Sequence, residues 1–387
     1  MSLTKEYNGC VMNSFKIRIF EPSVPEYRVA LFEGLANKYG DRIQLWSAPL
    51  TSAGTPSFPV ENMFYDYSHP LLKFGPFHWQ KGLSLNGLIK GDVIVVNGEI
   101  KGLSNLFYAV FAKLRGIRVI WWGHHWSSTS KMWKVLLRLQ VVKLLIDVYL
   151  CYTVSGIEFL KHHGFSNKLV FATGNTINQL PIKKSLEYWN EEKLLDFKFK
   201  KSLSDKNLLL VCGVLREKMR LHQLFAAIGA QQLNNKNILV AVIGDGPEKE
   251  RYLDAARKYN VNDKIIWLGA IRDENVMAPW FLSAKAYIYP GAIGLGILHS
   301  FSYGLPVITH DNAKHQMPEF EVMENEKTGL TFEENSIGDL SYKIGWLLSH
   351  EKERNEMSEY VRNLAFSKYS MDNMVANFVE AIEAAVK

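Results

Sequence analysis

The chain has 387 residues, of which 47% are hydrophobic and 22% charged, and its formal net charge is +6. This length allows about two domains, and this composition excludes a disordered or fibrous chain. The modest positive charge favours anionic ligands or an anionic membrane surface and does not require nucleic acid. Cys10, Cys151 and Cys212 are far apart and form no disulfide or metal-ligand pattern, which is typical of a reducing compartment.

The hydropathy pattern predicts no membrane-spanning helix, since no run of 18 apolar residues occurs. The first 15 residues also lack the long apolar core of a signal peptide. We therefore expect a cytoplasmic protein that can rest peripherally on the inner face of the plasma membrane.

Strands and helices are expected to alternate through residues 1–178. The expected strands are 15–20, 43–46, 92–97, 118–122, 145–153 and 168–172, and the expected helices are 27–38, 103–115 and 155–163. Such alternation is typical of a parallel sheet with helices on both faces. The sequence thus predicts one Rossmann-like domain over this half.

A second Rossmann-like domain is expected over residues 207–365. Its expected strands are 208–212, 238–243, 265–268, 286–289 and 305–309, and its expected helices include 221–230, 249–259 and 297–303. Residues 179–206 are charged and lack a clear strand, so we expect them to connect the two domains. Residues 366–387 are expected to form a C-terminal helix that crosses back to the first domain.

The stretch PGAIGLGILHSFSYGLPVIT, residues 290–309, is the most informative about function. It reads as the end of a buried strand, a glycine bend, a short helix and another strand. Glycines let the main chain approach a ligand closely, and free N–H groups at a helix start attract anions. The backbone of Gly294, Leu295 and Gly296 is therefore a candidate diphosphate site, the alternative being a tight turn that binds nothing.

Several motifs occur in an order that is similar to one protein family. They are LLLVCGVLREK (208–218), LVAVIGDGPEKERYL (239–253), IIWLGAI (265–271), the glycine stretch and EKTGLTF (326–332), with weaker matches at VPEYRVALFEGLA (24–36), WGHHW (122–126) and GNTIN (174–178). The chain resembles the retaining family-4 glycosyltransferases, which have the GT-B fold of two Rossmann-like domains with parallel sheets facing across a cleft.

This resemblance implies a division of labour between the two domains. The C-terminal domain would hold a UDP- or GDP-linked sugar, with Gly213 beside the donor and Ile271 in the loop that reads the base. The N-terminal domain would hold the acceptor, with Tyr27 and Arg28 on that side. The resemblance also implies a variant site, because Gly291 and His299 stand where the family carries a pair of glutamates.

Two residues could compensate for that missing pair. His299 can hydrogen-bond a ribose hydroxyl, although a histidine on an apolar helix is otherwise a core residue. Glu319, within QMPEFE at 316–321, is our candidate for the missing carboxylate that contacts the sugar, and the alternative is a solvated acidic loop. The motif QMPEFE resembles that of a bacterial subset of the family.

Two further groups of residues are candidates for catalysis. Arg216 and Lys218 follow the first strand of the second domain and could neutralise a leaving diphosphate, unless they are only surface charges in a turn. His124 and His125 follow a strand expected to end at the site, and we favour His124 over His125 as a contact of the donor sugar, against simple packing among tryptophans. No Asp-x-Asp pair occurs, so no metal or other cofactor is expected.

Two segments predict a surface for a lipid-linked acceptor. Residues 131–149 place Lys and Arg among bulky apolar residues, and residues 64–81 mix aromatic residues with lysines. A basic surface with apolar edges can dock on anionic headgroups, while the alternative is a buried helix whose basic side chains reach solvent.

These observations together predict a hexosyltransferase that elongates a lipid-linked glycan in bacterial surface polysaccharide synthesis. Two other readings remain open at this point. One is a nucleotide-sugar epimerase on the same fold, and the other is a protein that binds nucleotide-sugars without catalysis, which the missing glutamate pair suggests.

Overall fold

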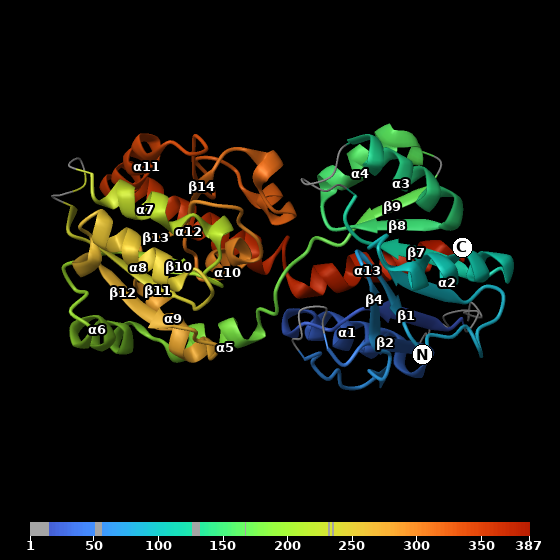
Figure 1. Ribbon diagram of the computed structural model, residues 1–387. Helices are drawn as coiled ribbons and strands as arrows, with labels where there is room; N and C mark the ends of the chain where they lie inside the picture. The colour runs from blue at the N-terminus through green and yellow to red at the C-terminus, as the bar shows by residue number, and fades with distance from the viewer. Residues whose placement is uncertain (1–14, 51–55, 126–131, 167, 231–232, 234–235) are drawn as a thin grey trace, which may run out of the picture. The chain divides into compact units, whose positions relative to one another are not determined.

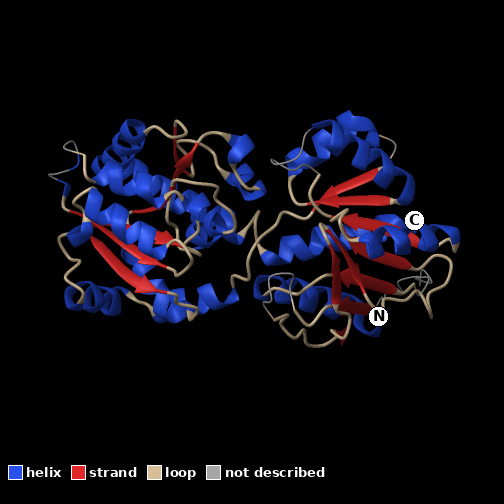
Figure 2. Cartoon of the chain, viewed as in Figure 1, coloured by secondary structure: helices blue, strands red, loops and turns tan. Residues whose placement is uncertain are grey.

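The structure is a computed structural model that describes residues 15–50, 56–125, 132–166, 168–230, 233 and 236–387. The chain divides into two compact units. The first unit runs to Cys151 and also holds Gly156–Ala172 and Asn377–Lys387, and the second holds Tyr152–Ser155 and Thr173–Ala376. Each unit is built on a parallel sheet with helices on both faces, as Figures 1 and 2 show, so the predicted α/β class of two Rossmann-like halves is confirmed.

The sheet of the first unit has the order β3-β2-β1-β6-β7-β8-β9, and its neighbouring strands are all parallel. Its strands are β1 (Ile17–Glu21), β2 (Ile43–Ser47), β3 (Phe64–Asp66), β6 (Val93–Asn97), β7 (Arg118–Trp122), β8 (Val148–Cys151) and β9 (Leu169–Ala172). Its helices are α1 (Glu26–Tyr39), α2 (Leu103–Leu114) and α3 (Met132–Leu145), with most of α4 (Val154–Leu160). An antiparallel hairpin, β4 (Leu71–Phe74) and β5 (Phe77–Gln80), was not expected from the sequence.

The central strands of this sheet are buried on both faces, which explains their continuous apolar runs. In β7, Trp121 packs into a cluster with the inner sides of α2 and α3. The next residue, Trp122, points to the opposite face and contacts Phe32 of α1 and Phe378 near the C-terminus. Successive side chains of β7 therefore pack against helices on opposite faces of the sheet.

The sheet of the second unit has the order β12-β11-β10-β13-β14-β15 and is also parallel. Its strands are β10 (Asn207–Cys212), β11 (Ile238–Ile243), β12 (Ile265–Gly269), β13 (Ala286–Tyr289), β14 (Val307–His310) and β15 (Gly329–Phe332). Its helices are α5 (Leu180–Tyr188), α6 (Glu191–Lys200), α7 (Leu221–Ile228), α8 (Lys249–Lys258), α9 (Glu274–Ser283), α10 (Gly296–Ser302), α11 (Ile337–Ser349) and α12 (Glu351–Phe366), with the start of α13 (Met371–Val386).

Alternate residues of β10 show how this sheet carries two cores. Leu209 and Val211 pack into a cluster with α7, α8 and α11. Leu208 and Leu210 point the other way and pack with α9 and α10. Both faces of the strand are thus buried, and its main-chain N–H and C=O groups pair with β11 and β13.

Residues 179–206 belong to the second unit and do not form the expected connection between the domains. They form α5 and α6, and both helices pack against α9 of the second unit. Phe197 of α6 packs edge-on against Trp280 of α9, with 5.1 Å between ring centroids. The charges that suggested a linker lie on the outer side of these helices, so this segment belongs to the second unit.

Candidate functional site

The second sheet has a topological switch point between β10 and β13. The chain moves outward from β10 to β12, then returns and places β13 on the other side of β10. In open parallel sheets, ligands bind at the carboxyl ends of the strands on either side of such a reversal. The loop after β10, residues 213–220, and the loop after β13, residues 290–295, both begin at this point. The predicted donor residues of these two loops are therefore brought together.

The loops at the switch point pack main chain against main chain. A Cβ atom added at Gly291 would lie 1.8 Å from the carbonyl oxygen of Lys218, and the N–H of Ala292 donates to that same oxygen at 3.2 Å. A Cβ atom added at Gly244 would lie 2.0 Å from the oxygen of Gly213. No side chain fits at position 291, so the absence of a glutamate there follows from the packing of this chain.

Arg216 and Lys218 expose their side chains beside these loops. The main chain of Arg216 is fixed, because its carbonyl oxygen accepts a hydrogen bond of 2.7 Å from the hydroxyl of Tyr252. Burial raises the pKa of Tyr289, at the end of β13, to about 12, while the charge of Arg216 acts in the opposite direction. The loop that carries Arg216 therefore lies beside the end of β13, where an anionic ligand would be expected.

The glycine bend before α10 is held by Gln316. The N–H of Ile293 donates to Gln316 Oε1 at 2.7 Å, and Gln316 Nε2 donates to Thr309 Oγ1 at 3.0 Å and to the carbonyl oxygen of His310 at 2.9 Å. The sequence motif contained Gln316, but its role was not predicted. The bend that contains the half-buried Gly294, Leu295 and Gly296 is consequently fixed from the neighbouring strand.

Glu319 and Glu321 have different roles although they are two residues apart. Glu321 accepts hydrogen bonds of 2.7 Å from the N–H groups of Val154 and Ser155, and so caps the start of α4. Glu319 is buried, accepts a hydrogen bond of 2.7 Å from Asn175, and has its Oε2 3.8 Å from where a Cβ atom of Gly294 would be. Glu319 is therefore the carboxylate that faces the glycine bend, and the alternative of a solvated acidic loop does not hold for it.

His299 lies on α10 and is paired with Glu274, which the sequence analysis did not single out. His299 Nε2 lies 2.7 Å from Glu274 Oε1, and the Tyr303 hydroxyl donates to the same oxygen at 2.6 Å. Burial would lower the pKa of His299, but its hydrogen bonds to Cys212 and Glu274 and the charge of Glu274 raise it to about 10. These contacts favour the imidazolium form of His299, and its contact with a ribose stays a prediction.

Changing Glu274→Gln is expected to make the stability of the second unit depend differently on pH. The folded-state pKa of His299 lies above its usual value of 6.5, so the stabilisation it provides is complete below that value and is lost as the pH rises towards 10. The substitution should lower the free energy of unfolding by about 1–2 kcal/mol near pH 6.5, and by little near pH 10. Urea unfolding at several pH values measures both numbers.

Glu250→Gln is the matched control for this experiment, because Glu250 is an exposed residue of α8 in the same unit. It should leave unfolding unchanged at every pH. A loss for Glu274→Gln that is equal at pH 6.5 and pH 10 would contradict the charged state assigned to His299.

Ile271 follows β12, whose carboxyl end lies at the same edge of the sheet. Its side chain is half-buried and packs against the core on the α9 face. The structure therefore places Ile271 in the expected loop, and its contact with a base stays a prediction.

The first unit has its own switch point, between β1 and β6. There Arg28 donates a hydrogen bond to Glu21 at the end of β1, and Asn97 at the end of β6 donates to both oxygens of Glu21 at 3.2 Å. Arg28 also lies 4.4 Å from the ring centroid of Trp122. The neighbouring Tyr27 is half-buried, so both predicted acceptor-side residues lie close to this switch point, with Glu21 and Asn97 as partners that were not predicted.

His124 and His125 differ in their surroundings. The ring of His125 packs against Phe159, with centroids 5.2 Å apart, and leaves no room for a Cβ at Gly156. His124 is more exposed, and its pKa is lowered by partial burial and then by the charge of Arg28. The contact of His124 with a donor sugar stays a prediction, and Trp126 of the same motif lies outside the described residues.

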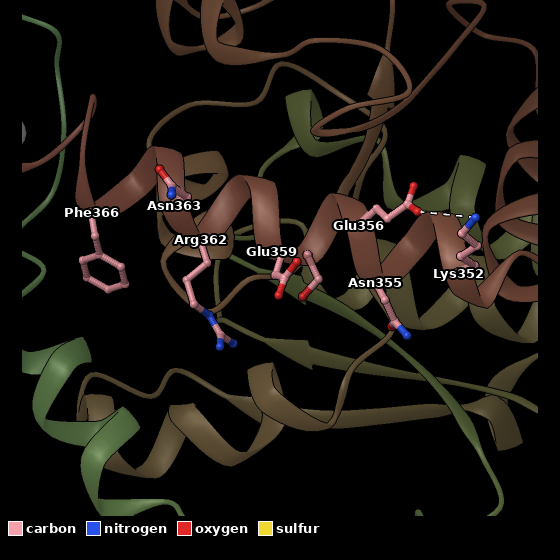
Figure 3. A pocket seen from close by; sticks show the side chains of 8 residues that line it. Lys352, Asn355, Glu356, Glu359, Arg362, Asn363 and Phe366 are labelled. Carbon is pink, nitrogen blue, oxygen red and sulfur yellow. Dashed lines mark ion pairs between the residues drawn. The ribbon is translucent and has the colours of Figure 1, made fainter.

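A separate hollow lies along α12 and contains none of the predicted site residues. Figure 3 shows that the side chains lining it come from one helix, where Lys352 and Glu356 are 3.9 Å apart. Arg362, at its other end, donates to the carbonyl oxygen of Tyr303 at 2.9 Å. This hollow is a surface feature of the helix, and the switch point remains the candidate site.

Comparison with protein families identifies the domain that carries this site. Residues 193–364 match the family described as glycosyl transferases group 1. This region spans α6 to most of α12 and contains both loops of the switch point. It is therefore a glycosyltransferase domain, which confirms the predicted enzyme class for this part of the chain.

Comparison with individual proteins supports the same fold. A segment of 54 residues is 39% identical to protein CapJ of Staphylococcus aureus, and this match covers 14% of each chain. HepE of Anabaena, solved with UDP, superposes with a TM-score of 0.68 at 11% identity over 95% of this chain and 100% of its own. A glycosyltransferase of Rickettsia africae gives a TM-score of 0.68 at 14% identity over 97% and 99%. At these identities the structures establish the GT-B fold alone.

Proposed function

We propose that this protein transfers a hexose or related sugar from a nucleoside-diphosphate-sugar to a glycan acceptor. The observation that carries the proposal is the packing of the two loops at the β10/β13 switch point, within a glycosyltransferase group 1 domain. Its structural neighbour HepE is described in complexes with UDP, with UDP and glucose, and with UDP-glucose. A UDP- or GDP-linked donor in the second unit is consistent with the packing at the switch point and with the ligands of HepE.

In the proposed reaction, the bond between the sugar C1 and the diphosphate oxygen breaks, and a bond from C1 to the acceptor oxygen forms. The main-chain N–H groups of Gly294, Leu295 and Gly296, with the cations Arg216 and Lys218, stabilise the charge that grows on the leaving diphosphate. A leaving-phosphate oxygen takes the acceptor proton. The new bond forms on the face that the diphosphate leaves, so the anomeric configuration is retained, and no metal is needed.

The other predicted residues orient the reactants in this proposal. His299 hydrogen-bonds the ribose, Gly213 and Ile271 lie against the nucleotide, and Glu319 orients the donor sugar. Tyr27 and Arg28 act at the switch point of the first unit, on the acceptor side, and His124 contacts the donor sugar. The acceptor is a lipid-linked glycan of bacterial surface polysaccharide synthesis, assembled on the inner face of the plasma membrane.

Calorimetry with UDP, GDP and their common hexose conjugates tests the first half of this proposal, and transfer to a lipid-linked glycan tests the second. We expect one nucleotide and its sugar conjugate to bind at micromolar concentration. Turnover of the donor without an acceptor, giving an isomeric nucleotide-sugar, would instead identify an epimerase. The absence of binding to every nucleotide would contradict the proposal.

Changing Glu319→Gln is expected to lower the affinity for the nucleotide-sugar by about tenfold. The affinity for the free nucleotide should not change, because only the sugar would contact this carboxylate. Calorimetry with the two ligands gives the two affinities. Glu321→Gln is the matched control: it removes the carboxylate that caps α4, and should lower thermal stability without changing the ratio of the affinities. Equal effects of the two variants on that ratio would remove Glu319 from the sugar site.

A further inference from the structure

Helix α2 presents its large apolar side chains to solvent. Leu103, Phe107, Val110, Phe111 and Leu114 are all exposed, and Leu114 is 78% exposed. Their spacing of three and four residues puts them on one face of the helix. The fully buried residues of the helix are small, namely Ser104, Asn105, Ala109 and Ala112, while Leu106 and Tyr108 are partly buried and pack against the core. The helix thus presents apolar side chains to solvent as well as to the core, unlike the usual surface helix, whose solvent face is polar.

Helix α3 also exposes large apolar side chains, although its buried face is apolar as well. Its exposed apolar residues are Met132, Trp133, Leu137, Val141 and Leu144, and Leu144 is 79% exposed. It buries only Val135, Leu139 and Val142. The alternative of a helix that is buried all round therefore does not apply to residues 132–145.

The two helices belong to one continuous region of the first unit. Helix α2 contacts α3 and also contacts β5 of the hairpin. Trp79 of β5 packs edge-on against Phe107, with ring centroids 5.4 Å apart. Phe74 and Phe77, at the turn of the hairpin, are exposed as well. We call the exposed apolar residues of α2, α3 and this turn the apolar face.

The stretch of chain that carries α2 and α3 has charge of one sign. Between Glu99 and Asp147 the sequence contains eight Lys and Arg residues and no Asp or Glu. Asp147 is already engaged, at 2.7 Å from Lys113 and 3.6 Å from Arg118. Exposed Lys134 stands next to Trp133 on α3, with its Nζ 5.5 Å from the ring centroid. The apolar face is thus accompanied by uncompensated positive charge.

We propose that the apolar face docks on an anionic lipid bilayer. Bulky apolar side chains beside lysine and arginine are the pattern of helices that lie in the membrane interface, where the apolar side chains enter the acyl boundary and the cations meet phosphate. A second copy of this chain would set positive charge against positive charge, whereas a bilayer supplies both an apolar layer and negative charge. No helix among the described residues is long and apolar enough to span a bilayer.

This docking is independent of nucleotide binding and is tested without it. The full chain is sedimented with vesicles of phosphatidylcholine alone, or with added phosphatidylglycerol. We expect binding only to the anionic vesicles, and a decrease of about fivefold or more when NaCl is raised from low to high concentration, because salt screens the charges. The triple variant Leu114→Ser, Leu137→Ser, Leu144→Ser should bind at least about tenfold more weakly.

The control variant removes equally exposed apolar residues from the second unit. Leu195→Ser with Phe199→Ser on α6, where Phe199 is 78% exposed, should bind vesicles as the unchanged protein does. Circular dichroism should show that both variants stay folded, since only solvent-exposed side chains are changed, and both should keep their affinity for UDP or GDP. Failure of nucleotide binding in the unchanged protein would bear on the sugar-transfer proposal alone.

Three results would overturn the docking proposal. The first is an unchanged protein that stays in the supernatant with anionic vesicles at low salt, and the second is a triple variant that binds as well as the unchanged protein. The third is a dimer, detected by light scattering, that the triple variant converts to a monomer, because the apolar face would then be an interface between copies.

Discussion

Replacing Arg216 and Lys218 together with alanine is expected to lower kcat/KM for sugar transfer by about 10²- to 10³-fold. The leaving diphosphate gains negative charge as its bond to the sugar breaks, so cations fixed beside it stabilise the transition state more than the bound donor. Both side chains are exposed, so the free energy of unfolding should change by less than about 0.5 kcal/mol. Steady-state kinetics with the donor identified by calorimetry measures the effect, which should be larger on kcat than on KM.

Arg251→Ala provides the control for this double variant. Arg251 is an exposed arginine of α8 in the same unit, paired with Glu217 and Glu248 at the surface. It should keep kcat/KM within about twofold, because a surface ion pair of this kind contributes little. If the Arg216 and Lys218 variant were equally active, these residues would be surface charges of a turn and the site would lack its cations.

Changing Gly291→Ala is expected to destabilise the second unit by about 3 kcal/mol and to lower its Tm by roughly 6–12 °C. The added methyl group would lie 1.8 Å from the carbonyl oxygen of Lys218, so the loop after β10 must move. Because that loop carries Arg216, the nucleotide affinity should fall as well. Gly291→Glu, which restores the residue usual in the resembling family, should be more harmful still. Scanning calorimetry with and without nucleotide gives both quantities.

Gly338→Ala is the matched control for the glycine variant. Gly338 lies in the first turn of α11, and a Cβ atom there meets nothing within 4 Å. Alanine should stabilise this helix by about 0.5–1 kcal/mol, because it restricts the unfolded chain. A Gly291→Ala variant that unfolds at the temperature of the unchanged protein would show that the β10 and β13 loops are not held as described.

Most of the two sheets could be predicted from the sequence because their strands are short apolar runs bounded by glycine or charge. Strands such as β6 and β11 were expected within one residue of their observed bounds. Helix α9 was not expected, since Pro279 inside it is a helix breaker in most contexts. The sequence predicts a linker at α5 and α6 because their charged residues outnumber the few aromatic residues, such as Phe197, that pack against the second unit.

The candidate site could be predicted only in part. The glycine loops and the cations after β10 are local in sequence, so their pattern was visible. The pairing of His299 with Glu274 joins α10 to α9 across 25 residues, and no spacing in the sequence indicates it. The reason for Gly291 is equally hidden, because the atom that excludes a side chain there belongs to Lys218, in another loop.

Gln316 has a consequence for the energetics of donor capture. Its three hydrogen bonds to Ile293, Thr309 and His310 fix the main-chain conformation of the glycine bend whether or not an anion is bound. A diphosphate would thus meet main-chain amides that are already held in place, and little ordering entropy would be lost on association. Gln316→Leu should therefore slow nucleotide association, because the glycine bend would lose its fixed conformation and would have to adopt it again as each nucleotide binds.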